Sequence, residues 1–347
     1  AGRGATSRLD DLQQAALLRE ALEGIAELEA RAPIDRSSRL DDATRAERLR
    51  RDTSTCHLEG ELAQALTLTA ALDERRALAE HAVSLARGLD PPDTHLTARA
   101  LLIERLHRLE PEHVEDRLAN LDQVLAIAPS GRSVDATLAA LTYRHEDLLL
   151  CGRRAEARRS LDEAIELADR SEHPYWRWAT AAWRGLDALI DGDLDRAEQR
   201  AFDAMALAEP GEPGAEACLG VNLVNIRLYQ HRSAEVLDLL AGAADASPHI
   251  PCYRAVLALC AAEAGDTALA ERSYDCFRTT AFAGIPEDTN RLLTLVVLAD
   301  TAVQLGDAPS TDVLRDLLLP SAGLRRSSTA TAAEARTGAP SPTNWAA

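Results

Sequence analysis

The sequence contains no lysine, so all 38 of its basic residues are arginines. Without lysine the chain cannot form a GxxxxGK-Ser/Thr phosphate loop, a Schiff base or a lysine general base. Arginine is also outnumbered, because 56 Asp and Glu residues give a formal net charge of −18. Nucleic-acid interfaces need a clustered excess of basic residues, whereas the arginine-rich segments 48–51 and 153–154 are flanked by acidic residues. We therefore expect no direct nucleic-acid partner.

Aromatic residues are also scarce, since Phe, Tyr and Trp together make up 3% of the chain. β-branched and aromatic residues favour strands, whereas Ala, Leu, Arg and Glu are the strongest helix formers and are abundant here. No apolar run reaches the ~18 residues of a membrane-spanning helix, and no signal peptide is recognisable. The composition therefore predicts a soluble, cytoplasmic, all-α protein with no membrane partner.

Motifs for catalysis and for metal binding are missing. The six cysteines form no CxxC pair and no zinc spacing, and the nine histidines form no HExxH. No GxSxG motif is present, and the paired carboxylates lack the DDxxD spacing. Asp191-Gly192-Asp193 lacks the other ligands of a calcium loop, which favours a turn. We expect a protein that is not an enzyme, has no metal or cofactor, and holds buried free thiols in a reducing cytoplasm.

The two ends of the chain differ from its middle. The sequence starts at Ala1 and its only methionine is Met205, so either the start was removed or this is an excised piece. Helical periodicity stops near Leu324, and residues 325–347 are mostly Ser, Thr, Ala, Gly and Pro. Such a segment cannot bury enough apolar surface to offset its ordering entropy. We predict a disordered tail.

A glycine-centred motif recurs along the chain. Gly152, Gly192, Gly265 and Gly306 are separated by 40, 73 and 41 residues, and a degenerate copy over 228–235 lies midway in the long interval. The period of about 36 to 41 residues is close to that of tetratricopeptide repeats. Glycine tolerates the left-handed conformation that ends a helix, and the alanine that follows each motif permits close helix approach. The recurrence predicts a tetratricopeptide-like α-solenoid of about eight stacked helical hairpins.

Apolar spacing places the individual helices. Over residues 155–168 apolar residues recur at intervals of three and four residues, which is typical of one face of a helix. The polar residues between them are expected to face outward: Arg158, Arg159, Asp162 and Glu163. Upstream, helices are predicted over 9–32, 76–87, 97–109 and 114–127. Pro174, Pro210, Pro251 and Pro286 lie at or just before the start of a unit, where proline is tolerated.

This pattern divides the chain into three parts. Residues 1–69 form N-terminal helices that are only loosely repeat-like, residues 70–324 form the repeat array, and residues 325–347 form the tail. Within the first part, residues 36–55 are polar and charged, and both a surface helix and a loop fit them.

Three of the four tryptophans lie close together, in a chain otherwise short of aromatic residues. In one interpretation they are core residues that pack between stacked helices. In the other they line the concave groove of the superhelix and bind a protein or small-molecule effector. Trp176 and Arg177 are expected to be the most exposed. The candidate binding residues are His173, Tyr175, Trp176, Arg177, Trp178 and Trp183.

These residues also carry a resemblance to a known family. Three segments resemble the C-terminal helical-repeat region of large actinobacterial regulators: His173-Pro174-Tyr175-Trp176-Arg177-Trp178, Leu189-Ile190-Asp191-Gly192-Asp193-Leu194-Asp195-Arg196-Ala197-Glu198 and Leu317-Leu318-Leu319-Pro320. In that family a nucleotide-binding ATPase module precedes the repeats, and a LuxR-type helix-turn-helix or a nucleotide cyclase domain lies elsewhere in the chain. The resemblance covers roughly residues 70 to 324.

The chain also departs from that family. It has no phosphate loop and no recognisable DNA-binding helix pair, and Arg325-Arg326-Ser327 and the tail stand where the family has further repeats. We expect a frameshift or a truncation after Leu324. The resemblance implies the role of a sensor or interaction portion, beside an ATPase module, in an ATP-dependent transcriptional regulator that acts in signal transduction. A free-standing tetratricopeptide adaptor is the alternative, and an all-helical enzyme with an aromatic pocket is a third hypothesis.

Overall fold

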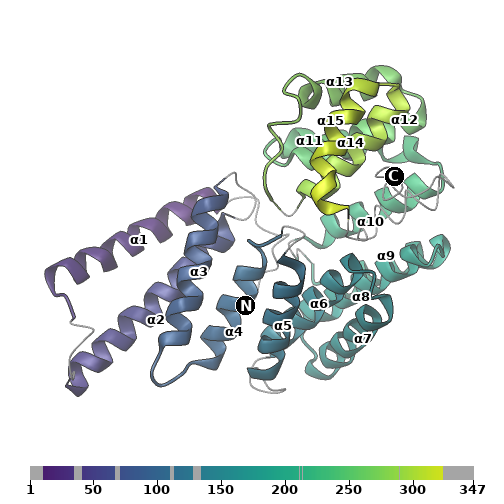
Figure 1. Ribbon diagram of the computed structural model, residues 1–347. Helices are drawn as coiled ribbons and strands as arrows, with labels where there is room; N and C mark the ends of the chain where they lie inside the picture. The colour runs from purple at the N-terminus through teal and green to yellow at the C-terminus, as the bar shows by residue number, and fades with distance from the viewer. Residues whose placement is uncertain are drawn as a thin grey trace. The chain divides into compact units, whose positions relative to one another are not determined.

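The computed structural model describes residues 11–34, 41–66, 71–109, 113–127, 134–210, 212, 214–288 and 290–322. Over these ranges the regular structure is fifteen α-helices and two short 3₁₀ helices, without a strand (Figure 1). The predicted all-α fold is therefore confirmed. The predicted disordered tail at 325–347 lies outside the described residues.

The helices follow one another with short connections. In chain order they are α1 (Asp11–Arg31), α2 (Asp42–Ala65), α3 (Leu72–Gly88), α4 (Thr94–Arg105), α5 (Val114–Ile127), α6 (Val134–Leu150), α7 (Arg154–Ser171), α8 (Pro174–Ile190), α9 (Leu194–Leu207), α10 (Ala215–Tyr229), η2 (Ser233–Val236), α11 (Leu237–Ala246), α12 (Pro251–Ala264), α13 (Thr267–Arg278), α14 (Arg291–Leu305), α15 (Ala308–Leu318) and η3 (Leu319–Ser321). The chain divides into two compact units, Ala1–Tyr143 and Arg144–Ala347, with the boundary inside α6. The division predicted from the sequence at residues 69 and 324 stays a prediction.

In the N-terminal unit each helix from α1 to α5 packs on its neighbour in sequence, and α2 also contacts α4. The segment left open between helix and loop is helical from Asp42 onward, because the Asp41 carboxylate accepts a hydrogen bond from the Thr44 amide at 2.7 Å and caps α2. The helix predicted over 97–109 is displaced along the chain, since α4 starts at Thr94 and ends at Arg105. Gly60 lets α2 approach the Ile103 side chain of α4 closely, because a Cβ atom there would lie 2.9 Å from Ile103 Cδ1 and that side chain would have to shift.

Arginine side chains within this unit donate hydrogen bonds to the backbone that follows α4. Arg75 and Arg117 are each only 1% exposed. Arg117 Nη1 donates to the Arg108 carbonyl at 2.8 Å, and Arg76 Nε donates to the His107 carbonyl at 3.0 Å. The buried Arg117 and the partly buried Arg76 therefore stabilise the backbone that leaves α4, a role that composition alone would not assign to arginine.

The C-terminal unit repeats one helix-ending turn five times. Gly152, Gly192, His231, Gly265 and Gly306 all have positive φ, between 55° and 81°. In each turn the amide of the positive-φ residue donates a hydrogen bond to the carbonyl three residues earlier in the chain. The amide of the following residue donates to the carbonyl five residues earlier than its own position. These donor–acceptor distances are 2.8–3.3 Å. This is the Schellman arrangement. The predicted left-handed glycines are confirmed, and His231 takes their place in the degenerate copy.

The helix after each turn begins in one of two ways. Asp193, Asp266 and Asp307 accept a hydrogen bond from the amide three residues later, which caps α9, α13 and α15. Arg153 and Arg232 make no such cap. Instead, each guanidinium forms a bidentate pair with the glutamate three residues later, at 2.7–2.8 Å.

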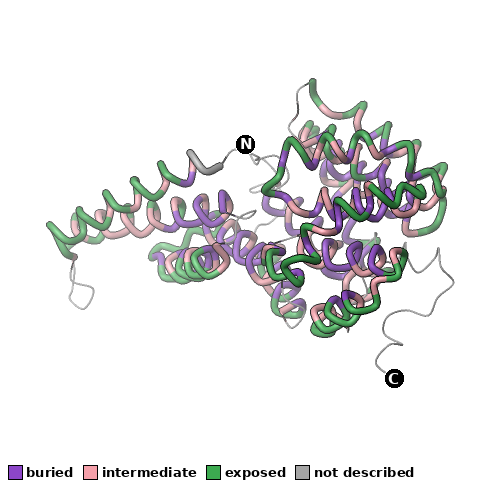
Figure 2. Tube along the Cα trace, turned by 90° about the horizontal axis from the view of Figure 1, so that it is seen from above, coloured by how far each residue is buried: buried purple, intermediate pink, exposed green. Residues whose placement is uncertain are grey.

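A small buried residue follows each of the first four turns at the same distance. Ala157, Ala197, Val236 and Ala270 lie five residues after the left-handed residue, and all four are at most 5% exposed. Figure 2 shows buried residues gathered on the inner faces of the helices in each unit, with exposed residues along the outer faces. The alanine that the motif predicts is therefore a contact point between the two helices of a pair.

The turn residues give a direct test of this repeat. Gly192→Ala should lower the free energy of unfolding by about 1 kcal/mol, because alanine disfavours positive φ. No atom lies within 4 Å of a Cβ at Gly192, so the change adds no clash. His231→Gly should raise stability by up to about 1 kcal/mol for the converse reason. Urea unfolding of both variants measures the two effects, and equal shifts of the same sign would contradict the argument.

Burial of His107 makes stability depend on pH. Burial, helped by Arg75 and Arg76, lowers the pKa of His107 from 6.5 to about 3. The unfolded chain takes up a proton below about pH 6.5 while the folded chain does not, so this contribution is intact above pH 6.5 and falls as the pH drops. Between pH 7 and pH 5 the loss should be about 2 kcal/mol. In His107→Leu that part of the pH dependence should disappear, whereas in the exposed control His249→Leu it should persist.

Candidate functional site

Helix α8 carries most of the candidate binding residues. Pro174 occupies its first turn, as predicted, and His173 precedes it in an extended conformation. Residues 176, 180, 183 and 187 are spaced by three and four, so they share one side of α8. Residues 178, 182 and 185 share the side roughly opposite. The aromatic residues therefore fall on two different faces of one helix.

One face packs towards α9 and α10. Trp178 is 5% exposed and belongs to a core cluster with Ala182, Ala204 and Ala215. Tyr175 makes edge-on contacts with Trp178, at 5.5 Å between ring centroids, and with Trp176, at 5.0 Å. For Trp178 the core interpretation holds, since its ring fills the space between alanine-lined helices.

The other face packs towards α6 and α7. The Trp183 ring lies edge-on to His145, with 5.5 Å between centroids and 77° between planes. His145 is fully buried, and its Nδ1 lies 2.9 Å from the Ala157 carbonyl. A carbonyl only accepts, so Nδ1 carries the proton and the Nε2 lone pair points into the core without a hydrogen-bond donor. Burial lowers the pKa of His145 and keeps the ring neutral.

The site residues thus separate into three environments. Tyr175, Trp176 and Trp178 come together, Trp183 lies against His145 instead, and Arg177 is exposed. The prediction that Arg177 is exposed is confirmed. Trp176 is half-buried and packs against the Trp178 cluster, so it is less exposed than expected.

An ion-pair network beside this face joins α7 to α8. Arg158 Nε lies 3.0 Å from Asp187 Oδ2, and its Nη2 lies 3.0 Å from Asp191 Oδ2. Arg154 also pairs with Asp191. The hydrogen bond and the charge of Asp187 raise the pKa of Arg158. Asp191 ends α8 and precedes the left-handed Gly192, so the predicted turn at this position is confirmed.

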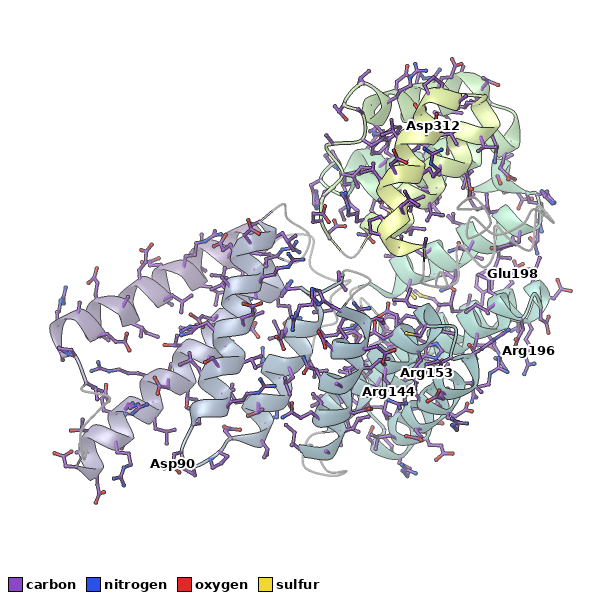
Figure 3. All side chains as sticks on the ribbon, viewed as in Figure 1. Asp90, Arg144, Arg153, Arg196, Glu198 and Asp312 are labelled. Carbon is purple, nitrogen blue, oxygen red and sulfur yellow. The ribbon has the colours of Figure 1, made fainter. Side chains whose placement is uncertain are left out.

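The next pair of helices is joined with the charges exchanged. Glu198 of α9 lies six residues after its left-handed turn residue, as Arg158 does in α7. Its carboxylate pairs with Arg227 of α10 at 2.5 Å. Figure 3 labels Glu198 on the structure. The sequence alone predicts no partner for Arg158 or Glu198. Their shared position, six residues after the left-handed residue, is a signal that could have identified both.

The chemistry most like acid–base catalysis lies in the N-terminal unit. Glu59 is 9% exposed, and its Oε2 lies 2.8 Å from His81 Nδ1. Burial raises the pKa of Glu59 against the opposing effect of His81. Nearby, Cys56 Sγ donates to the Ala82 carbonyl at 3.2 Å, and burial raises its pKa to about 11. A thiol in that state is a poor nucleophile, which favours a structural role for this group.

The cysteines are more varied than predicted. Cys56, Cys252 and Cys260 are buried as expected, but Cys276 is exposed, and the remaining two are partly buried. Within the described ranges, no three His, Cys, Asp or Glu side chains are placed to share a metal ion. In the same ranges, none of the helices combines the length and the apolar character needed to cross a bilayer.

Comparison with protein-family models and with curated protein sequences finds no match. The resemblance to the repeat region of actinobacterial regulators therefore depends on the segments quoted above. It stays a prediction, as does the concave groove around α8.

Replacing the tryptophans one at a time separates core from surface roles. Trp178→Ala should lower the free energy of unfolding by about 3–5 kcal/mol, because it empties a buried site. Trp176→Ala should cost clearly less, since part of that ring is already in contact with solvent. Thermal and urea unfolding measure both variants, and equal losses would assign Trp176 to the core as well.

Proposed function

We propose that this chain is a tetratricopeptide-like α-solenoid that binds a protein or small-molecule effector without catalysing a reaction. The observation that carries the proposal is the helix-ending turn repeated at Gly152, Gly192, His231, Gly265 and Gly306. Stacked helical hairpins built on such a repeat present extended surfaces that are suited to binding.

The binding site in this proposal lies at the start of α8. There the half-buried His173, Tyr175 and Trp176 adjoin the exposed Arg177. Aromatic rings with one exposed edge beside a guanidinium group are typical of interaction surfaces, because they combine apolar area with directed hydrogen bonds. Such a surface suits an effector that combines an apolar part with an acidic group.

In the fuller form of the proposal the chain is the sensor portion of an ATP-dependent transcriptional regulator in the cytoplasm. The absence of lysine leaves this chain without a phosphate loop, so the ATPase module would be a separate domain or protein. An effector that binds one arrangement of α7, α8 and α9 more tightly biases that arrangement. The pairs from Arg158 to Asp187 and Asp191 lie across the α7–α8 contact and would change with it.

Affinity capture with the chain as bait tests the proposal. Arg177→Glu and Trp176→Ala baits should lose partners that the unaltered chain retains, while the melting temperature of Arg177→Glu stays unchanged. A bait carrying Arg315→Glu, on α15, is the matched control and should retain them. A captured ATPase whose turnover responds to an added effector supports the regulator, and a captured protein without ATPase activity supports the adaptor. Retention of every partner by all baits would contradict binding at α8.

A further inference from the structure

Two helix-interior glycines in the C-terminal unit are not needed for its folding. Gly220 lies in α10 and Gly242 in α11, and neither has positive φ. A Cβ atom at Gly242 would meet nothing within 4 Å, and one at Gly220 would meet only Leu239 Cδ2, at an ordinary 3.8 Å. Glycine inside a helix costs about 0.5–1 kcal/mol relative to alanine. Neither a turn nor the packing of this chain explains that loss.

Exposed apolar side chains adjoin both glycines. Val221 follows Gly220, and Leu239 lies one turn before Gly242 on α11. Each is 51% exposed. Because a Cβ atom at Gly220 would lie 3.8 Å from Leu239 Cδ2, the Leu239 side chain of α11 lies beside Gly220 of α10 on one surface. The small and apolar residues therefore form one patch, which we call the α10–α11 surface: Gly220, Val221, Leu239 and Gly242.

The surroundings of this surface are acidic. Between Arg200 and Arg254 the chain has seven carboxylates and only two arginines, Arg227 and Arg232. Arg227 lies in the last turn of α10 and Arg232 lies just after it, and they pair with Glu198 and Glu235. Neither arginine therefore compensates the carboxylates beside the surface.

Three of these carboxylates flank the α10–α11 surface directly. Asp238, Gly242 and Asp245 are spaced by four and three, so they share one side of α11. Glu216 lies one turn before Gly220 on α10. Among the described residues Asp245 has one ion pair, at 3.5 Å to Arg254, while Asp238 and Glu216 have none. A ligand that approaches here meets apolar area bordered by negative charge.

We propose that the α10–α11 surface docks a cationic amphipathic helix of a partner protein. The two glycines let a helix backbone approach closely, Val221 and Leu239 supply the apolar contact, and the carboxylates attract lysine and arginine at the edges of that helix. A second copy of this chain would bring the same carboxylates and be repelled. The proposal is independent of the effector site on α8, since it uses α10 and α11 alone.

Peptide binding with paired glycine variants tests this docking surface. The probe is a synthetic amphipathic helix of about 18 residues, with Leu and Ala on one face and Lys on the other. In the control peptide Glu replaces every Lys. The unaltered chain should bind the Lys peptide and not the Glu peptide, and binding should weaken when salt rises from about 50 to about 300 mM.

Gly242→Gln should then weaken binding of the Lys peptide by about tenfold or more, because the new side chain fills the docking surface without changing net charge. It should not lower the melting temperature, since the position is open and glutamine is the better helix former. Gly24→Gln is the matched control, since Gly24 also lies inside a helix with nothing within 4 Å, but in α1. That variant should bind as the unaltered chain does.

Asp238→Lys provides a second variant. It should bind the Lys peptide more weakly than the unaltered chain does, and it should bind the Glu peptide. If Gly242→Gln and the unaltered chain bind the Lys peptide with equal affinity, the proposal is overturned, and the binding is a diffuse attraction of the basic peptide to an acidic protein. Failure of the unaltered chain to bind the Lys peptide, or equal binding of both peptides, would also overturn it.

Discussion

The left-handed residue that ends the first helix of each pair is the constraint on which the C-terminal unit depends. It turns the chain within two residues, and its two hydrogen bonds satisfy carbonyls that would otherwise be left at the helix end. Because the reversal has the same geometry each time, the following helix starts in the same register. After each of the first four turns a buried side chain, such as Ala157 or Ala197, follows five residues later.

Specificity between neighbouring pairs comes from side chains that the turn does not determine. Arg158 pairs with Asp187 and Asp191, whereas at the next junction the acidic Glu198 pairs with Arg227. The exchange of charge means that each junction would place like charges together if the units stacked in the wrong order. Partly exposed ion pairs contribute little stability, so their main effect here is on the order of stacking.

The sequence predicts those features that depend on one residue type at one position. Left-handed glycines and buried alanines are of this kind, because few other residues fit. The start of α2 could not be predicted, since its polar first half buries little surface and only the Asp41 cap marks it. The two faces of α8 follow from spacing, but only the tertiary contacts show that Trp178 is covered by α9 and α10 while Trp183 meets His145.

The degenerate unit shows why departures from a repeat are informative. His231 replaces the glycine, and Arg232 replaces the capping aspartate. Here the second helix begins as the 3₁₀ segment η2, and α11 has only 10 residues. This same pair of helices carries the two glycines that folding does not need and the half-exposed Val221 and Leu239. These features coincide in one pair of helices, and they are consistent with the docking surface that we propose there.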